Sequence, residues 1–562
     1  MRYRRAPCLV LAALVIAGGA AAGPRNEYVF EWNTVMNNND LMPPLEVRSF
    51  NSYNQPSVNA HGVVVVRARS RGGPPLGPPT HGIYTRDAAD PDSSIIRVLD
   101  KAMHVPHPNN LDTLFVETPS FPRIDRDSTA IVTRANHQPG WRYLLDDGSE
   151  TRAGTTGIYA NPYGELLTGA AKLGNVPGFS FYGVPEFNGV MFEVFPGAPA
   201  ITGGNTIVFK GNYTVDGTSR TGVYFRVLDS APSGGDAPSI MIANNTDTLI
   251  PGTGTVFGST APPNAEDGYA VFAGFDDEEA PTLGGIYLAR LEFQPALRTL
   301  VSIGGDVPGG NAGDTFNALG EGSSFDGRFV GFWGAWGSET RTLRLYCPQE
   351  GNKDRIAYCN QALVCRDTGE TRGDPESICD DETDPNFGTA CYVEREIPVN
   401  QGIFVHDTRR KQSQLIARTG SSFEDFLFWN YSGKTPCAGS GHSEEGGEDD
   451  GESVRWRASA FLSVSGRGGV TYNVAFKAAS ADDVTGIYLK KHPGKSNLVT
   501  VADTTMPGQY LDPEAPADSR IIALGIEREG LRGRWLAINA TMGVEGGEEE
   551  DGMAGIYVTR VR

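Results

Sequence analysis

Short apolar runs that alternate with polar residues recur along the whole chain, and turn residues separate them. Each of seven such runs is rich in β-branched or aromatic residues and ends in Ala or Gly. A period of two with this composition predicts β-strands. The runs are residues 63–68, 130–135, 206–211, 269–274, 329–334, 473–478 and 535–540.

A tripeptide of Gly, then Ile or Val, then Tyr or Phe follows every one of these runs, and we term it the GIY motif. Further extended stretches lie before each run and after most of the motifs. Each unit therefore contains four predicted strands, A to D from the innermost to the outermost, with the alternating run on B and the motif on C. The seven copies begin at Gly82, Gly157, Gly222, Gly285, Gly402, Gly486 and Gly555.

Seven four-stranded units predict an all-β fold, a seven-bladed β-propeller. The 70 glycines and 37 prolines in 562 residues fit a protein with many turns. A pair of β-sandwiches is the alternative, but it does not account for seven equal motifs. The last unit ends at Arg562, five residues after Tyr557, which leaves no room for a strand D. Residues 28–36 alternate and belong to no unit, so we predict that they close the ring as strand D of the last blade.

The N-terminal residues have the pattern of an export signal. Three arginines precede an apolar run at residues 9–17, and small residues follow up to Ala22. The run is too short to span a bilayer, and no later stretch is apolar enough to do so. We predict a signal peptide at residues 1–22, a single propeller domain at residues 23–562, and a secreted or periplasmic location.

Six cysteines lie in one part of the mature chain, five of them in a predicted insertion of blade five at residues 346–400. In an oxidising compartment they predict three disulfides, and the sequence leaves all fifteen pairings open. A zinc site is the alternative, although paired C-x-x-C spacing is missing. The cysteines are Cys347, Cys359, Cys365, Cys379, Cys391 and Cys437.

The chain is acidic, with a formal net charge of −20. This charge argues against nucleic acid or anionic lipid as a partner, since both require basic surface. A glycan or an extracellular protein remains as a candidate partner, and we expect a monomer. Residues 444–452 lack apolar side chains, and we predict a disordered loop at residues 438–453. The acidic runs at 276–279, 482–483 and 545–551 do not have the spacing of a calcium loop, so no metal or other cofactor is predicted and calcium stays an alternative.

The B–C and D–A connections of a four-stranded blade share one face, and here the B–C connections carry the most unusual sequence. Loops held by a rigid scaffold often carry function, so this face is the first candidate for a functional site. Aromatic residues are the first candidates, because their rings stack on sugars, although packing between blades is the alternative. They are Trp333, Trp336, Trp429 and Tyr431.

Basic residues in the strand-B runs are the second group of candidates. They are suited to a pocket for an acidic sugar, and pairing with neighbouring acids is the alternative. They are Arg67 and Arg134, with Lys210 and Lys477 at the matching positions.

The repeat resembles that of uncharacterised secreted bacterial proteins with tandem N-x-x-G-x-x-A-F-x-A units. The matching residues are 468–478 and, with more divergence, 59–68, and the resemblance covers nearly the whole mature chain. It implies an exported, propeller-like protein and provides no catalytic residues. H-E-x-x-H, G-x-S-x-G and P-loop motifs are absent from the sequence. We expect a binding protein for a glycan or a protein; the alternative is a propeller-type polysaccharide lyase or glycoside hydrolase that acts on an acidic polysaccharide.

Overall fold

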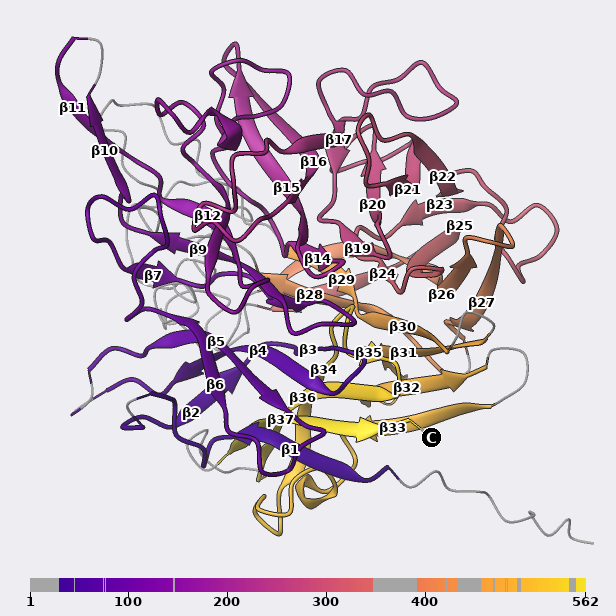
Figure 1. Ribbon diagram of the computed structural model, residues 1–562. Coiled ribbons are helices and arrows are strands. Elements are labelled where there is room, and N and C mark those ends of the chain that lie inside the picture. Colours follow the sequence, from indigo (N-terminus) through magenta and orange to yellow (C-terminus); the bar gives the residue numbers. More distant parts are fainter. Residues whose placement is uncertain are drawn as a thin grey trace, which may run out of the picture.

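Seven antiparallel sheets form a ring of blades around a central axis in the computed structural model of the protein (Figure 1). This arrangement confirms the predicted seven-bladed β-propeller. The structure describes residues 30–44, 46–73, 75, 77–144, 147–346, 392–420, 422–431, 456–467, 471–480, 482, 484–492, 497–544 and 552–561.

The first four blades follow the predicted order of strands. Blade one contains β2 (Phe50–Tyr53), β3 (Ser57–Val58), β4 (Val63–Ser70), β5 (His81–Asp87) and β6 (Ile96–Asp100). Blade two contains β7 (Phe115–Glu117), β8 (Arg123–Ile124), β9 (Ile131–His137), β12 (Thr156–Ala160) and β13 (Leu167–Ala171). Blade three contains β14 (Ala200–Thr202), β15 (Thr206–Val215), β16 (Thr218–Val227) and β17 (Ile240–Asn244). Blade four contains β18 (Ser259–Thr260), β19 (Asn264–Glu266), β20 (Tyr269–Phe275), β21 (Gly284–Arg290) and β22 (Leu297–Ser302).

The last three blades complete the ring, and two hairpins and two short 3-10 helices lie in the connections. Blade five contains β23 (Phe316–Leu319), β24 (Ser324–Phe325), β25 (Phe329–Tyr346), β26 (Tyr392–Asp407) and β27 (Gln412–Arg418). Blade six contains β30 (Leu462–Arg467), β31 (Thr471–Ala479), β32 (Thr485–Lys491) and β33 (Leu498–Asp503). Blade seven contains β34 (Arg520–Gly525), β35 (Leu531–Arg532), β36 (Trp535–Gly543), β37 (Met553–Arg560) and β1 (Trp32–Asn37). The other elements are β10 (Trp141–Leu144), β11 (Glu150–Ala153), β28 (Leu427–Tyr431), β29 (Trp456–Ala460), η1 (Ser180–Tyr182) and η3 (Gly508–Tyr510).

The GIY motif is a packing device inside each blade. The aromatic ring lies over the glycine two residues before it, so a Cβ on Gly486 would lie 2.9 Å from the Tyr488 hydroxyl. In six blades a phenylalanine meets this aromatic ring edge to face at 4.8–5.2 Å, an arrangement that contributes about 0.5–1.5 kcal/mol beyond burial alone. The motif therefore forms the middle of the blade.

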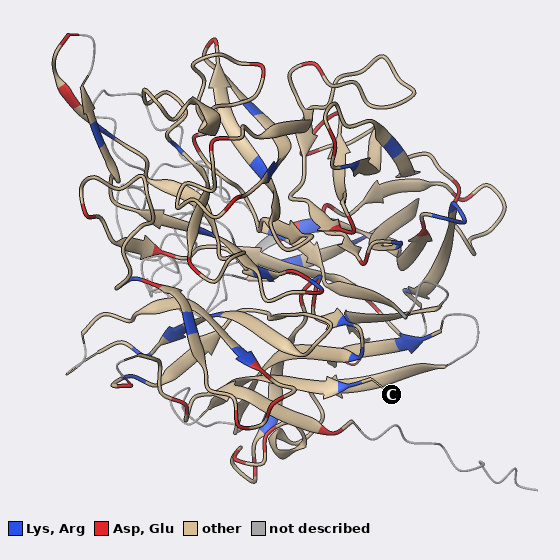
Figure 2. Ribbon diagram, viewed as in Figure 1, with Lys and Arg blue, Asp and Glu red and all other residues tan. Residues whose placement is uncertain are grey.

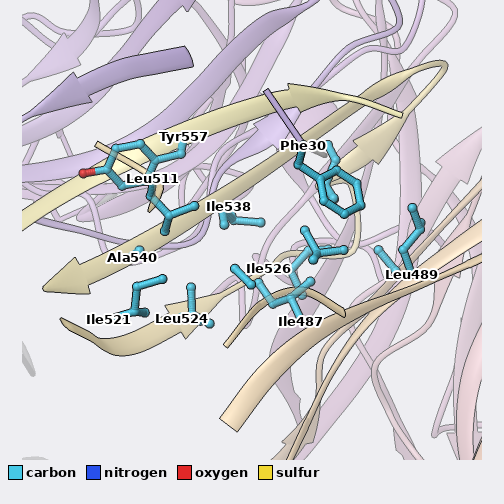
Figure 3. Close-up of a cluster of buried hydrophobic side chains, with 14 of the residues drawn as sticks. Phe30, Ile487, Leu489, Leu511, Ile521, Leu524, Ile526, Ile538, Ala540 and Tyr557 are labelled. Atoms are coloured by element: carbon cyan, nitrogen blue, oxygen red, sulfur yellow. The ribbon is translucent and has the colours of Figure 1, made fainter. Parts of the chain in front are cut away.

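Strand D has a β-bulge opposite the motif in all seven blades. In blade seven this strand is β1, which pairs antiparallel with β37 and has its bulge at Val35. The N-terminal strand therefore closes the ring as predicted, with bounds of Trp32–Asn37 in place of residues 28–36. Phe30 precedes it and packs in the cluster between blades six and seven, together with Ile487, Leu489 and Ile526 (Figure 3).

Strand A is the innermost strand of each blade, as predicted, but it is interrupted. In five blades it is broken into an outer and an inner piece that both pair with strand B. The inner pieces β3, β8, β19, β24 and β35, with β14 and β30, each contact the corresponding strand of the next blade, so they form a closed ring in the middle of the molecule (Figure 1). The interruptions are due to short segments that contain Pro or Gly, which the alternation of strand B does not reveal.

Several predicted features lie wholly or partly outside the described residues. They are the signal peptide at 1–22, the six cysteines, the acidic loop at 438–453, the acidic run at 545–551 and most of the insertion at 346–400. Among the described residues, no helix is long and apolar enough to cross a membrane.

Candidate functional site

The interruptions of strand A surround the axis, and we term them the axial kinks. In blades three and six the outer piece of strand A is reduced to a single bridge, Val194 to Asn212 and Asp425 to Ala479. In blade six the kink is enlarged into an insertion that contains the β28–β29 hairpin, which therefore lies near the middle of the ring (Figure 1). The kinks of blades one to seven are residues 54–56, 118–122, 195–199, 261–263, 320–323, 426–461 and 526–530.

The basic residues of the strand-B runs lie at the level of these kinks. Each pairs with the middle residue of the GIY motif, as Arg67 does with Ile83 and Lys477 does with Ile487. Arg134 and Lys210 occupy the same register position in blades two and three. The same position of strand B therefore carries a cation beside the axis in four blades. The Lys and Arg residues on the strands of the ring are visible in Figure 2.

Arg67 connects the kinks of blades one and two. Its Nη1 donates to Asn54 Oδ1 at 3.1 Å, and its Nε donates to the backbone carbonyl of Thr118. The Thr118 hydroxyl lies 3.0 Å from Nδ1 of His81. Burial, and after it the charge of Arg67, lowers the pKa of His81 to about 4, so this imidazole is neutral at pH 7. The sequence analysis did not identify His81, because it precedes the motif of one blade only.

Arg134 and Lys477 also make contact with neutral groups of the kinks. Nη1 of Arg134 donates to the carbonyl of Phe195 at 2.8 Å, while its buried Nε has no hydrogen-bond partner. The Lys477 ammonium lies 3.9 Å from the ring centroid of Phe428 and 5.8 Å from that of Phe461, both in the blade-six insertion. Burial lowers the pKa of Lys477 to about 8.

These four cations are only weakly compensated by charge. In the described part of the chain, no carboxylate lies within 4 Å of Arg67, Arg134, Lys210 or Lys477, so the alternative of pairing with neighbouring acids is not observed. Burial lowers the pKa of all four groups. A partly buried cation with only neutral partners retains a desolvation cost of up to several kcal/mol, which an incoming anion would offset.

The blade-seven kink carries a further cation across the axis. Its backbone is fixed because the Ser324 and Ser463 hydroxyls both donate to the carbonyl of Arg528, at 2.6 and 2.9 Å. Nη1 of Arg528 donates to the carbonyl of Pro262 at 3.3 Å. In the same segment Glu527 accepts a 2.8 Å bond from Arg123, and the side chains of both residues are nearly fully buried. This segment ties blades two, four, five and six together at the axis.

The predicted aromatic residues lie apart from the arginines, in blade five and in the blade-six insertion. Trp333 is buried and its Nε1 donates to Gln401 Oε1 at 3.1 Å. Trp336 is buried against Phe404 at the edge of a groove of about 500 Å³ between blades five and six. Tyr431 meets Trp456 edge to face across the hairpin at 5.6 Å, and Trp429 lies half-buried on the same side of β28. Ligand binding by these four residues stays a prediction.

In the part of the chain that the structure describes, one group of carboxylates could hold a cation, and it differs from the acidic runs of the sequence. One oxygen each from Asp127, Glu266 and Asp267 lies within 4.8 Å of the others, at the A–B turns of blades two and four. These turns are on the face opposite the B–C connections. Burial raises the pKa of Glu266 to about 8, so its carboxyl group is largely protonated at pH 7.

Fold and site together define a class: a seven-bladed propeller with basic strand-B residues at the level of the axial kinks in four blades. No protein-family model matches the chain, and no curated protein matches it. Among solved structures, similarity is found to Trypanosoma rangeli sialidase in complex with the inhibitor DANA, at 8% identity and a TM-score of 0.32 over 80% of this chain and 56% of the other.

Two further solved structures show comparable similarity. The polysaccharide lyase Uly1 matches at 8% identity and a TM-score of 0.27, over 52% of this chain and 56% of the other. The Pseudomonas aeruginosa periplasmic gluconolactonase PpgL matches at 12% identity and a TM-score of 0.24, over 80% of this chain and 95% of the other. The matched region is thus little more than half the length of the sialidase and the lyase. At these TM-scores the similarity carries no argument about function.

Proposed function

We propose that this protein is an exported binding protein whose ligand is an acidic glycan, held at the axial kinks by its acidic groups. The observation that carries the proposal is the pair Arg67 and Arg134. Both are partly buried at the same register position, and both side chains donate only to neutral oxygens of the kinks. A carboxylate placed between two such guanidinium groups gains charge-assisted hydrogen bonds that neutral sugars cannot supply.

The geometry favours binding from the face of the B–C and D–A connections. On the side of the A–B turns, the inner ring of strands lies between the solvent and the kinks. The blade-seven kink also crosses the axis. Glycan hydroxyls have amide and imidazole partners beside the arginines, in Asn54 and His81. Because His81 is neutral at pH 7, it adds a hydrogen-bonding group without a competing charge.

Isothermal titration calorimetry with a linear trisaccharide of galacturonic acid tests the proposal. We expect the wild-type protein to bind this probe and to bind a neutral trisaccharide of glucose at least tenfold more weakly. The variant Arg67→Gln/Arg134→Gln keeps hydrogen-bonding side chains and should lose at least tenfold in affinity for the acidic probe.

The matched control is Arg290→Gln/Arg410→Gln, which removes two exposed arginines near the C–D turns of blades four and five. It changes the net charge by the same amount, so an equal loss of affinity would mean that only overall charge matters, and the proposal would be wrong. Equal affinity of the wild type for acidic and neutral probes would also overturn it. Appearance of unsaturated or new reducing ends during incubation would replace binding by the lyase or hydrolase alternative.

A further inference from the structure

Thr118 connects two side chains of blade one, although it belongs to blade two. It is the first residue of the blade-two kink and is fully buried. Its hydroxyl lies 3.0 Å from Nδ1 of His81, and its backbone carbonyl accepts the hydrogen bond from Nε of Arg67. One buried residue therefore fixes an imidazole and a guanidinium group at the same time.

The pairing of β4 with β5 explains why these two side chains reach the same residue. His81 pairs with Arg69 of β4, which is two residues from Arg67. Paired side chains share a face of the sheet, as do side chains two residues apart, so His81 and Arg67 are diagonal neighbours on one face of blade one. This face packs against blade two, since Ile83, the partner of Arg67, lies in a hydrophobic cluster with Phe115.

The contacts around Arg67 decide which polar atoms remain for a ligand. Its Nε and Nη1 donate to Thr118 and Asn54, which leaves Nη2. Oδ1 of Asn54 accepts from this cation, so the amide is oriented with Nδ2 as its remaining donor. In the described part of the chain, Nη2 of Arg67, Nδ2 of Asn54 and Nε2 of His81 have no hydrogen-bond partner, and the three residues are half-buried.

The imidazole of His81 is better suited to a sugar hydroxyl than to a second acidic group. It is neutral at pH 7, because burial lowers its pKa to about 4. If Nδ1 accepts a hydrogen bond from Thr118, Nε2 is a donor; if Nδ1 donates, Nε2 is an acceptor. A hydroxyl can both donate and accept, so it pairs with Nε2 in either tautomer, whereas a carboxylate pairs with it in only one.

We propose that Nε2 of His81 hydrogen-bonds a hydroxyl of the ligand, next to the carboxylate that Arg67 binds. Thr118 is the positioning residue, because it holds the imidazole and the guanidinium side by side. This inference rests on the proposed function and specifies its ligand: a sugar acid with a free hydroxyl close to its carboxylate, such as a uronic acid. His81 is then the residue that distinguishes such a sugar from an acidic group without neighbouring hydroxyls.

Calorimetric titration with two forms of the linear trisaccharide of galacturonic acid, the free acid and its methyl ester, tests the inference. The ester keeps every hydroxyl and lacks the negative charges, so it separates the contact of His81 from those of the arginines. We expect the wild type to bind the acid about tenfold or more tightly than the ester. His81→Leu should lower the affinity for both forms by about fivefold, which corresponds to one hydrogen bond. Arg67→Gln/Arg134→Gln should lower it about tenfold for the acid and less than about threefold for the ester.

Variants of Thr118 test its positioning role. Thr118→Val removes the hydroxyl but keeps the backbone carbonyl that binds Arg67, so it should reproduce the loss caused by His81→Leu. Thr118→Ser restores the hydroxyl and should bind both forms like the wild type. A role in packing alone would be filled by Val and not by Ser. His61→Leu is the matched control, since His61 is exposed at the A–B turn of the same blade, and it should change neither affinity.

The outcomes separate this inference from the proposed function. If His81→Leu binds both forms like the wild type, or loses affinity for the acid alone, the inference is wrong, whether or not Thr118→Val folds. Wild-type affinity of a folded Thr118→Val excludes the positioning role. If the ester does not bind the wild type, no hydroxyl contact contributes and the inference is overturned. In each case a loss of acid binding by Arg67→Gln/Arg134→Gln leaves the proposed function standing. If the acid does not bind the wild type, the proposed function itself fails.

Discussion

The GIY motifs and the axial kinks are neighbours in every blade, but they differ in chemistry. The motifs are neutral, aromatic and nearly identical, and six of them make the same edge-to-face contact with a phenylalanine. The kinks differ in length and sequence from blade to blade, and the charged groups of the axis gather there. Repetition thus marks the scaffold, and variation marks the region where we propose that a ligand binds. The two regions should respond oppositely to substitution.

A substitution in a motif should have the largest effect on stability. A Cβ on Gly285 would overlap the carbonyl oxygen of Val301 on the neighbouring strand, so the backbone must move. We expect Gly285→Ala to lower the free energy of unfolding by about 3 kcal/mol in chemical denaturation. Gly254→Ala in the same blade is the control, because nothing lies within 4 Å of a Cβ there. Equal stabilities of the two variants would show that the motif glycine is not required for packing.

A buried acid of the axial region should produce an intermediate effect that depends on pH. Burial raises the pKa of Glu266 from its ordinary value of 4.5 to about 8. The folded state therefore binds this proton more tightly than the unfolded state does. The stability that protonated Glu266 contributes is present below pH 4.5 and is lost as the pH rises through 8. Glu266→Gln should remove this loss and stabilise the protein by roughly 2 kcal/mol at pH 8.5, with no gain at pH 4.5.

Thermal unfolding of wild type and Glu266→Gln across this pH range checks the prediction. Asp267→Asn is the matched variant, since Asp267 is the exposed neighbour in the same carboxylate group. A stability difference for Glu266→Gln that does not change with pH would contradict the proposed cause.

Replacement of a cation at an axial kink should have the smallest effect on stability. It should stabilise the protein, whereas replacement of a motif glycine should destabilise it. The folded state lowers the pKa of Lys477 from 10.5 to about 8, so its charge destabilises the fold below pH 8 and this cost disappears as the pH rises to 10.5. Part of the cost is offset by the contact with Phe428. We expect Lys477→Met to raise the free energy of unfolding by about 1 kcal/mol at pH 7 and by nothing at pH 10.5. A destabilised variant at pH 7 would show that Lys477 serves the scaffold.

The scaffold could be predicted from sequence because its signal is local and repeated. The motif counts the blades, and the missing strand D of the last unit predicts closure by β1. The alternation of strand B also predicts that Arg67 and Arg134 occupy matching positions in their blades. Trp333 occupies the same position in blade five, but its Nε1 donates a hydrogen bond within that blade. Alternation alone does not tell which of these side chains bonds to a kink and which bonds within its own blade.

The kinks could not be predicted, because they interrupt strand A with short segments that share no pattern. The inner piece of strand A is only two residues long in blade one and in blade five. Arg528 was missed for this reason, since its position depends on contacts with Ser324 and Pro262, which are distant in sequence. Contacts between blades that are far apart along the chain decide which charges meet at the axis.

A crystal structure of the protein with the galacturonic acid trisaccharide bound tests the central claim most directly. The account predicts that a carboxylate of the trisaccharide lies within hydrogen-bonding distance of both Arg67 and Arg134 at the axial kinks. A trisaccharide bound elsewhere, such as in the groove beside Trp336, with the axial arginines still bonded only to the kinks, would contradict it.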